Sequence, residues 1–328
     1  MRSVGIAGLG SYVPERILTN TDLEQMIDTS DEWIKTRTGI SARHIVAENQ
    51  STSDLAYEAA KTALKDAGLT AGDIDLIIVA TCTPDMLFPA TSCILQEKLG
   101  IKGTPAFDLE AACSGFIYGL AVGAQFIAAG LYENVLVVGA EALSRVVNWQ
   151  DRNTCVLFGD GAGAAVLRPV AKGKGILSFD MGADGAGADL LKVPAGGAAM
   201  PATDKTIAEG MHYMFMSGNE VFKFAVRVMG DTALKSLEKA GLSKEDITYV
   251  VPHQANMRIV DAAMRRLNLP LEKAYINLNK YGNMSSASIP VALDELYRTN
   301  RLNNGDTLLL VGFGAGLTWG SLVLKWDK

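Results

Sequence analysis

Short apolar runs alternate along this chain with longer segments whose apolar residues follow a helical spacing. In two places, at residues 63–78 and 236–251, a helical segment ends in Ala-Gly-Leu and a short turn leads into a β-branched run. Such alternation predicts mostly parallel sheets covered by helices, which is the α/β fold class. Functional residues are then expected at the carboxyl ends of the strands.

The chain also repeats itself, because two pairs of segments share one offset. The pairs are 63–78 with 236–251 (236 − 63 = 173) and 133–139 with 306–312 (306 − 133 = 173). Two independent matches indicate a duplication, and the period is too long for a solenoid. We predict two similar α/β halves, at 1–170 and 171–328. The stretch 182–208, rich in Gly, Ala and Pro, predicts a mobile rim.

Composition limits the possible functions. The 328 residues are 48% hydrophobic and 20% charged, which is enough for a large globular core. A net charge of −6 and a pI near 5.2 exclude a general attraction to nucleic acid or anionic membranes. The four cysteines form no CxxC or Cys/His metal pattern, and the first residues lead into a strand rather than a signal peptide. These features favour a reducing cytoplasm and no bound metal.

One segment tests this interpretation, because residues 111–132 carry no charged side chain and are long enough to span a bilayer. The segment is rich in Ala and Gly, includes Ser114 and Gln125, and lacks basic flanks. It is followed at once by the apolar strand 135–138. We therefore predict a buried helix and no membrane contact.

Cys113 lies between the predicted strand 105–109 and a helix that begins near 114–118. A thiol at the amino end of a helix is near the positive end of the helix dipole and near unpaired N–H groups, which lower its pKa and favour the nucleophilic thiolate. This placement predicts covalent catalysis. A small buried cysteine without a chemical role is the alternative that Cys113 alone leaves open.

Two further side chains follow predicted strands in the second half. Among the three histidines, only His253 comes directly after a strong strand signal, at 247–251, and the residues after it open a helix. Asn283 comes after the predicted strand 274–278, in a turn before another helix. A structural histidine and a turn-forming asparagine remain alternatives for each residue alone. Together with Cys113, they form a candidate catalytic set.

The glycine-rich loops do not predict a dinucleotide site. The segment 8–10 lacks the third glycine of that fingerprint, and the loops 159–163 and 312–316 precede strands rather than helices. We interpret 312–316 as a tight loop whose backbone N–H groups face a developing oxyanion, with an ordinary turn as the alternative.

Six ordered motifs resemble the thiolase-like condensing enzymes and, within them, the β-ketoacyl-acyl-carrier-protein synthase III family. The motifs lie at residues 31–39, 110–116, 158–163, 251–256, 281–288 and 312–320. The resemblance covers nearly the whole chain and implies a thiolase-like fold, in which two duplicated α/β halves with mostly parallel mixed sheets pack in an αβαβα arrangement. A Cys-His-Asn set distinguishes this branch from condensing enzymes that use Cys-His-His, so Asn283 carries much of the assignment.

The resemblance implies a two-stage Claisen condensation that initiates fatty acid biosynthesis. Cys113 would take an acyl group, acetyl by default, from an acyl-coenzyme A and pass it to malonyl-acyl-carrier-protein as that substrate loses carbon dioxide. His253 and Asn283 would hydrogen-bond the thioester oxygen of the malonyl group. The backbone N–H groups of Cys113 and Ala315, a position where the family often has glycine, would hold the oxyanion. No metal or redox cofactor is implied, since decarboxylation generates the carbanion.

Binding residues are implied by the same resemblance. Trp33 and Arg152 match positions that enclose the adenine of coenzyme A, and Arg37 and Asn256 match further coenzyme A contacts. Phe88 matches a position that reaches across a homodimer to limit the acyl pocket.

The family docks its acidic carrier protein on basic residues, which here are Lys223, Arg227, Arg258, Arg265 and Arg266. The last three stand at i, i+7 and i+8 on one helix face, and a solvated helix face is the alternative. Two rival functions also remain open. One is another Cys-His-Asn acyltransferase or hydrolase that uses free coenzyme A substrates, and the other is a non-catalytic subunit that binds acyl groups or a carrier.

Overall fold

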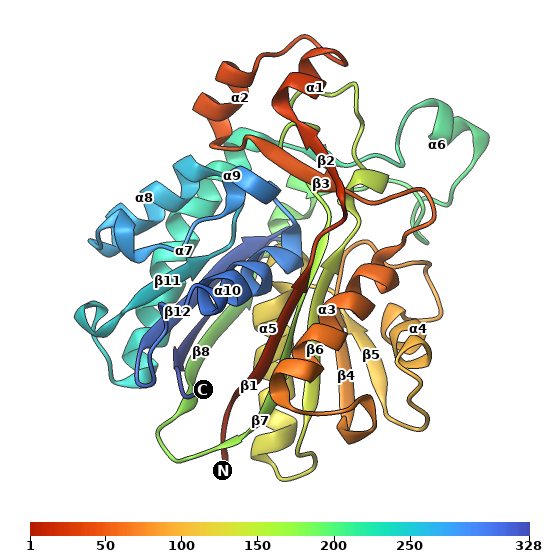
Figure 1. Cartoon of the computed structure of the whole chain (residues 1–328). Coiled ribbons are helices and arrows are strands. Elements are labelled where there is room, and N and C mark those ends of the chain that lie inside the picture. The colour runs from red at the N-terminus through yellow and green to blue at the C-terminus, as the bar shows by residue number, and fades with distance from the viewer.

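The computed structural model describes all 328 residues and contains two large mixed β-sheets, each formed by one half of the chain (Figure 1). The first sheet has the order β1-β7-β6-β4-β5, with β1 (Ser3–Tyr12), β4 (Leu76–Ala80), β5 (Ala106–Leu109), β6 (Val135–Glu141) and β7 (Gly161–Val170). The second has the order β11-β12-β13-β8, with β8 (Gly175–Ala183), β11 (Tyr249–Pro252), β12 (Thr307–Gly314) and β13 (Thr318–Lys325). The boundary at 170/171 remains a prediction.

Both sheets are mixed, as the resemblance implied, but parallel pairs are not the majority. Parallel pairing joins β4 to β5 and β6, and β11 to β12. The strands β1, β7, β8 and β13 pair antiparallel with their neighbours. For β12 and β13 the antiparallel pairing has a local cause. Only three residues separate these two strands, too few for the crossover that a parallel pair requires.

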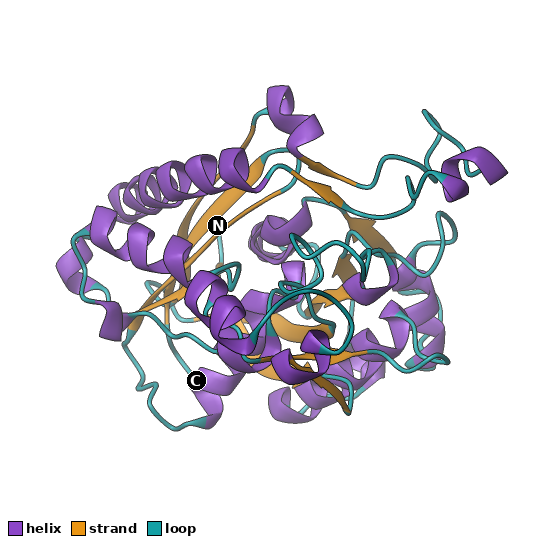
Figure 2. Ribbon diagram, turned by 90° about the horizontal axis from the view of Figure 1, so that it is seen from above, coloured by secondary structure: helices purple, strands orange, loops and turns teal.

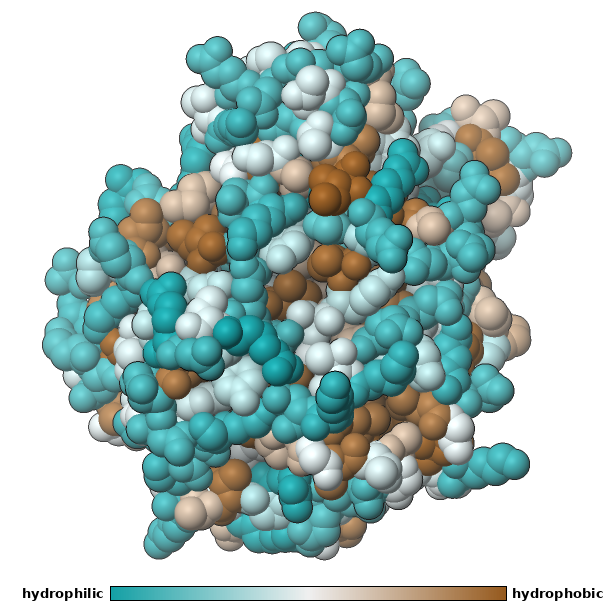
Figure 3. Space-filling view, in the orientation of Figure 1, coloured by the Kyte–Doolittle hydropathy of each residue, from teal (hydrophilic) through white to brown (hydrophobic).

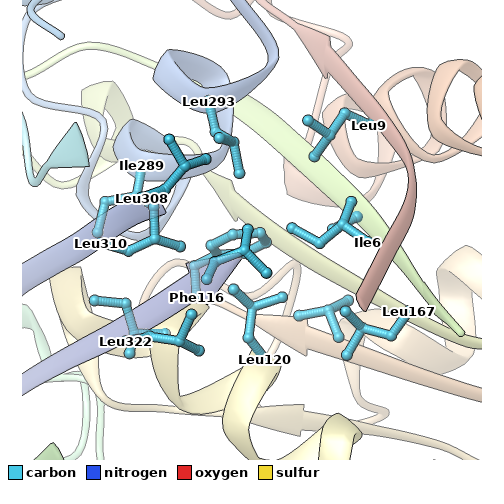
Figure 4. Close-up of a cluster of buried hydrophobic side chains, with 14 of the residues drawn as sticks. Ile6, Leu9, Phe116, Leu120, Leu167, Ile289, Leu293, Leu308, Leu310 and Leu322 are labelled. Atoms are coloured by element: carbon cyan, nitrogen blue, oxygen red, sulfur yellow. The ribbon is translucent and has the colours of Figure 1, made fainter. Parts of the chain in front are cut away.

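Helices and sheets form five layers. The helices α5 (Gly115–Ala128) and α10 (Ser288–Arg298) lie between the two sheets, where their apolar faces share one core with both (Figure 4). This core includes Ile6, Leu9 and Leu167 of the first sheet, Phe116, Leu120, Ile289 and Leu293 of the two helices, and Leu308, Leu310 and Leu322 of the second sheet. The outer layers are α3 (Thr52–Ala67) with α4 (Thr91–Lys98) and α7 (Gly218–Ala240) with α8 (Met257–Leu267). The predicted αβαβα arrangement is therefore confirmed.

The duplication is visible in the helix ends as well as in the strand order. The helices α3 and α7 both end at a glycine in the left-handed region, Gly68 and Gly241, each with φ 67°. The next turn carries the same capping box in both halves, formed by Thr70 with Asp73 and by Ser243 with Asp246. These equivalent residues are again 173 apart (241 − 68 and 243 − 70).

The remaining helices and strands, with the loops that join them, cover the end of the two sheets that is uppermost in Figure 1, and Figure 2 looks down on this end. They are β2 (Arg16–Thr19), β3 (Ala42–Ile45), β9 (Leu191–Lys192), β10 (Phe215–Met216), α1 (Asn20–Glu24), α2 (Asp31–Thr38), α6 (Asp204–Ala208) and α9 (Leu278–Tyr281). The predicted strand 274–278 is wrong, since only one bridge, Val250 to Ala274, forms there and Leu278 begins α9. The stretch 182–208 contains β9 and α6 rather than a single loop.

The uncharged segment 111–132 forms the central helix α5, most of whose residues are buried. No helix in the chain has the length and hydropathy needed to cross a membrane. On the face shown in Figure 3, hydrophilic residues cover most of the surface and hydrophobic residues form small separate patches.

Candidate active site

Cys113 lies in a one-turn helix, Ala112–Ser114, that joins the carboxyl end of β5 to α5. The turn begins with Ala112 at φ 45°, in the left-handed region that non-glycine residues seldom adopt. The Ser114 hydroxyl donates to the carbonyl of Ala111 at 2.8 Å, which fixes the turn. Cys113 is thereby held at the amino end of the central helix, as the sequence predicted, with 7% of its surface exposed.

Burial changes the expected acidity of this thiol. It raises the pKa of Cys113 to about 12, the charges of Glu141 and Glu110 act in the same direction, and the Ser285 side chain acts against them. A hydrogen bond from the Cys113 backbone also lowers the pKa, but it does not outweigh burial. The prediction of a thiol acidified by its helix is therefore wrong for the unliganded protein, in which Cys113 is protonated.

His253 follows the last residue of β11, and its backbone N–H donates to the carbonyl of Val311 on β12 at 2.7 Å. The side chain is 1% exposed, and the edge of Phe313 packs against the ring at 5.7 Å between centroids. Burial lowers the pKa of His253 to about 3, so the imidazole is neutral. Neither ring nitrogen has a hydrogen-bond partner, although buried polar atoms normally have one. The ring is therefore free to bond a substrate atom.

Asn283 is clamped through its backbone by a segment of the first half. Its N–H donates to the carbonyl of Leu157 at 2.9 Å, and its carbonyl accepts from Gly159 at 3.0 Å. The side-chain oxygen accepts from the N–H of Ser285 at 2.9 Å. The amide nitrogen is thereby left available as a donor.

Two cavities meet at Cys113. The first, of about 230 Å³, is lined by Cys113, His253 and Asn283 together with Asn256 and Arg258. The second, of about 510 Å³, is mainly apolar, and its lining includes Cys113, Cys82, Leu87, Leu143, Val146 and Met214. The fold therefore brings the three predicted catalytic residues together, with the thiol at the junction of the two cavities.

The loop after β12 lies beside the backbone of Cys113. A Cβ atom added to Gly314 would lie 2.6 Å from the Cys113 nitrogen and 3.2 Å from the Ala111 oxygen. Ala315 lines the second cavity, and the Thr318 hydroxyl lies 2.9 Å from the Ala111 oxygen and 3.0 Å from the Ala315 oxygen. Glycine at 314 thus allows a close approach that a side chain would prevent.

The predicted coenzyme A residues lie together, and one of them, Asn256, lines the first cavity. The Arg152 guanidinium stands 4.8 Å from the centre of the Trp33 ring, and that of Arg37 stands 5.9 Å from it. Asn256 caps α8 by accepting from the Arg258 N–H at 2.8 Å and donates to the carbonyl of Arg37 at 3.1 Å. Asn256 thus joins this aromatic and cationic group to the chamber that holds His253.

The five cations predicted to dock a carrier are exposed but do not form one free patch. Three of them have partners within the chain: Lys223 with Glu220 at 2.8 Å, Arg266 with Asp231 at 2.6 Å, and Arg265 with Asp261. Arg258 stands 5.4 Å from the Phe222 ring and lines the first cavity, and Arg227 forms no ion pair. Phe88 is 83% exposed and does not line the second cavity, whereas its neighbour Leu87 does.

Sequence reasoning missed Glu141, a fully buried carboxyl group at the end of β6 that accepts hydrogen bonds from both halves of the chain. One signal was present, because Glu141 ends an apolar strand that begins at Val135. No group of three or more His, Cys, Asp or Glu side chains is arranged to hold a metal ion.

Comparison with known proteins identifies the family. Models described as 3-oxoacyl-[acyl-carrier-protein (ACP)] synthase III and as the C terminus of this enzyme match residues 107–185 and 237–326. The β-ketoacyl-[acyl-carrier-protein] synthase III of Desulfitobacterium hafniense is 60% identical, with 100% of this chain and 99% of that protein covered.

Solved structures agree with this result. The synthase III of Thermus thermophilus has a TM-score of 0.91 at 50% identity, with 98% of this chain and 99% of that chain covered. The priming β-ketosynthase of the R1128 polyketide pathway has a TM-score of 0.92 at 36% identity, with 100% and 97% covered. These matches confirm the resemblance carried by the six motifs. The chain belongs to the β-ketoacyl-[acyl-carrier-protein] synthase III family.

Proposed function

We propose that this protein condenses an acyl-coenzyme A primer with malonyl-acyl-carrier-protein to give 3-oxoacyl-acyl-carrier-protein, carbon dioxide and coenzyme A, the step that initiates fatty acid synthesis. The observation that carries this proposal is the position of Cys113, at the junction of the larger, mainly apolar cavity and the smaller cavity that His253 and Asn283 also line. An acyl group on the thiol occupies the larger cavity and leaves the smaller one open for a second substrate.

In the first stage the Cys113 sulfur attacks the thioester carbon of the primer. The carbon–sulfur bond to coenzyme A breaks, and the proton of the Cys113 thiol ends on the departing coenzyme A. The backbone N–H groups of Cys113 and Ala315 hold the negative oxygen of the tetrahedral intermediate. Coenzyme A is bound by Trp33, Arg37, Arg152 and Asn256, the last of which lines the first cavity.

In the second stage malonyl-acyl-carrier-protein loses carbon dioxide, and the electron pair of the broken carbon–carbon bond forms an enolate. The enolate carbon bonds to the acyl carbon of the acyl-enzyme, the bond from that carbon to the Cys113 sulfur breaks, and the departing thiolate takes a proton from water. His253 and Asn283 donate hydrogen bonds to the enolate oxygen as its charge grows. A neutral His253 suits this role, since a ring N–H with no protein partner loses no existing bond when it binds the substrate. Decarboxylation supplies the carbanion, so the reaction needs no cofactor beyond its substrates.

The wider setting follows from the same proposal. The enzyme acts in the cytoplasm as a homodimer, in which Phe88 of each subunit reaches the acyl pocket of the other. Lys223, Arg227, Arg258, Arg265 and Arg266 receive the acidic carrier protein. The primer is acetyl-coenzyme A, and the chain divides at 170/171 into a half that carries the nucleophile and a half that carries His253 and Asn283.

A second candidate is a priming synthase with a different acyl starter, because one similar structure is the priming β-ketosynthase of a polyketide pathway. The test is the intact mass of the protein after incubation with acetyl-coenzyme A, beside Cys113→Ala, followed by a chase with malonyl-acyl-carrier-protein. We expect an acetyl adduct that the mutant lacks and the chase removes. An adduct with longer or branched acyl groups alone would support the second candidate, and no adduct with any primer would overturn the proposal.

A further inference from the structure

Each half of the chain contains the same sharp turn, and only one of the two carries Cys113. Ala112 has φ 45°, and Ser285, which is 173 residues later (112 + 173 = 285), also has φ 45°. Each residue begins a one-turn helix that leads into a central helix, α5 or α10. We call residues 112–115 the first elbow and residues 285–288 the second elbow. By the same offset, Cys113 corresponds to Ser286.

Each elbow packs against a strand of the opposite half. A Cβ atom added to Gly314 on β12 would lie 2.6 Å from the Cys113 nitrogen, and one added to Gly139 on β6 would lie 2.4 Å from the Ser286 oxygen. The residue of β6 equivalent to Gly314 is Glu141 (141 + 173 = 314). A carboxyl side chain therefore extends beside the second elbow from the position where the first elbow has a glycine.

Glu141 contacts the second elbow and the segment that follows β4. Its Oε1 lies 2.8 Å from the Ser286 hydroxyl oxygen and accepts from the Ser286 N–H at 3.4 Å. Its Oε2 accepts from the Thr83 hydroxyl at 2.7 Å and from the Cys82 N–H at 3.2 Å. The side chain is fully buried, so these bonds join the two halves beneath the active site without contact with solvent.

The second elbow also holds Asn283. The N–H of Ser285, one residue before the group bound by Glu141, donates to the Asn283 side-chain oxygen at 2.9 Å. This bond fixes which way the Asn283 amide nitrogen points, and it depends on the orientation of the Ser285 and Ser286 peptide groups. We propose that Glu141 is a positioning residue for condensation, because its carboxyl group holds the second elbow and thereby orients Asn283. The inference rests on the proposed function of Asn283.

Among the residues that line the acyl cavity, Thr83 depends less on Glu141, whereas Cys82 loses the partner of its N–H when Glu141 is removed. The Thr83 hydroxyl also accepts from the N–H of Ala142 at 2.9 Å, and the Thr83 carbonyl accepts from the Thr52 hydroxyl. These bonds remain when Glu141 is removed. Loss of Glu141 therefore impairs condensation, which uses Asn283, more than acyl transfer to Cys113.

The hydrogen count at Ser286 identifies the conservative variant. Its hydroxyl has one hydrogen and lies 2.8 Å from both the Ala80 carbonyl and Glu141 Oε1. The Ala80 carbonyl can only accept, so it takes the single hydroxyl hydrogen of Ser286. The contact between Ser286 and Glu141 is then a hydrogen bond only when Glu141 carries a proton and donates it, and burial raises the pKa of Glu141. Glutamine at 141 reproduces the bond to the Ser286 oxygen through its NH₂ group. It loses two long contacts to Oε1, from the Ser286 N–H at 3.4 Å and from the Cys82 N–H at 3.3 Å, while the Cys82 N–H keeps its contact at 3.2 Å with the other oxygen.

The experiment measures the two stages separately in Glu141→Ala, Glu141→Gln and a control, Asp180→Ala. Asp180 is also a buried carboxyl, but it bonds Thr232 and Lys239 away from both elbows. Each protein is acetylated with acetyl-coenzyme A, the adduct is measured by intact mass, and single-turnover loss of the adduct is followed after malonyl-acyl-carrier-protein is added. The condensation rate is measured again with added formate, which fits the space left by the carboxyl group.

For Glu141→Ala we expect near-normal acetylation, a condensation rate lower by about 100-fold, as for an active-site group displaced by about 1 Å, and partial rescue by formate. Glu141→Gln and Asp180→Ala should condense at close to the wild-type rate. Equal loss of both stages in Glu141→Ala, or unchanged condensation, would overturn the proposal. If Glu141→Ala does not fold, Glu141→Asp must show the same selective loss. A wild-type adduct that malonyl-acyl-carrier-protein does not discharge would instead refute the proposed function.

Discussion

Substitution of Gly314 by alanine tests whether acyl transfer depends on open space beside the Cys113 N–H. The new Cβ would lie 2.6 Å from the Cys113 nitrogen, whereas ordinary contacts begin at 3.4 Å, so one backbone segment must move by at least 0.8 Å (3.4 − 2.6). The nearest atoms are backbone or the Ala112 Cβ, and none can rotate away. The displacement therefore falls on the first elbow.

A shift of about 1 Å in a reacting group costs about 100-fold in rate, which is about 2.7 kcal/mol in activation free energy. The extra methyl group in a packed interior should also lower the free energy of unfolding by roughly 1–3 kcal/mol. This loss is smaller than the total stability of a typical protein, so the variant should still fold at 25 °C. We therefore expect Gly314→Ala to fold, with a lower melting temperature, and to acetylate Cys113 about 100 times more slowly.

Gly312→Ala is the matched control on the same strand. Its new Cβ would lie 3.3 Å from the His253 Cβ and from the Ile289 Cδ1, so a shift of only 0.1 Å (3.4 − 3.3) relieves the contact. The assay is the time course of the acetyl adduct by intact mass, with thermal unfolding of each variant. A folded Gly314→Ala protein that acetylates within a few-fold of the wild-type rate would show that the space beside the Cys113 N–H is not used.

Three further outcomes follow from the site. The pKa of His253 is about 3 in the folded protein and about 6.5 in the unfolded chain. Between pH 6.5 and pH 3 only the unfolded chain binds a proton at this histidine, so the stability of the folded protein falls as the pH drops through this range. Between pH 7 and pH 4.5 the wild type should lose roughly 3 kcal/mol of unfolding free energy on this account, and His253→Asn should lose correspondingly less; urea unfolding at the two pH values measures both. Arg152→Ala removes a stacking partner of Trp33 and should raise the KM for acetyl-coenzyme A roughly fivefold, the equivalent of about 1 kcal/mol; an unchanged KM would place the adenine elsewhere. Arg258→Glu should raise the KM for malonyl-acyl-carrier-protein, with a difference from wild type that shrinks as salt is added, and a KM that does not change would argue against docking at this face.

Much of the fold could be predicted from the sequence because local signals repeat. The two Ala-Gly-Leu helix ends and their capping boxes lie 173 residues apart, and the same offset relates the two elbows. The strand 274–278 could not be predicted correctly, since its apolar residues pack beside β11 with a single bridge and Leu278 already belongs to α9.

The candidate site was predictable where function depends on position along the chain, and not where it depends on packing. Cys113 and His253 each come after a strand, so their convergence could be inferred from the order of elements, whereas Asn283 comes after the short helix α9 and not after the strand that the sequence predicted. The raised pKa of the Cys113 thiol comes from the two sheets and helices that bury it, which no local pattern contains. Glu141 is buried because the second elbow, which lies far from it in the sequence, packs over the end of β6, and no local pattern contains this contact.

The reciprocal packing of the elbows also determines how the molecule comes apart. Each half closes its turn against a strand of the other, and α5 and α10 share one core with both sheets. Neither half keeps its apolar faces covered when the other unfolds, so the two should melt in a single cooperative transition. Polypeptides cut at 170/171 should then gain their structure, and the ability to be acetylated, only when both fragments are mixed.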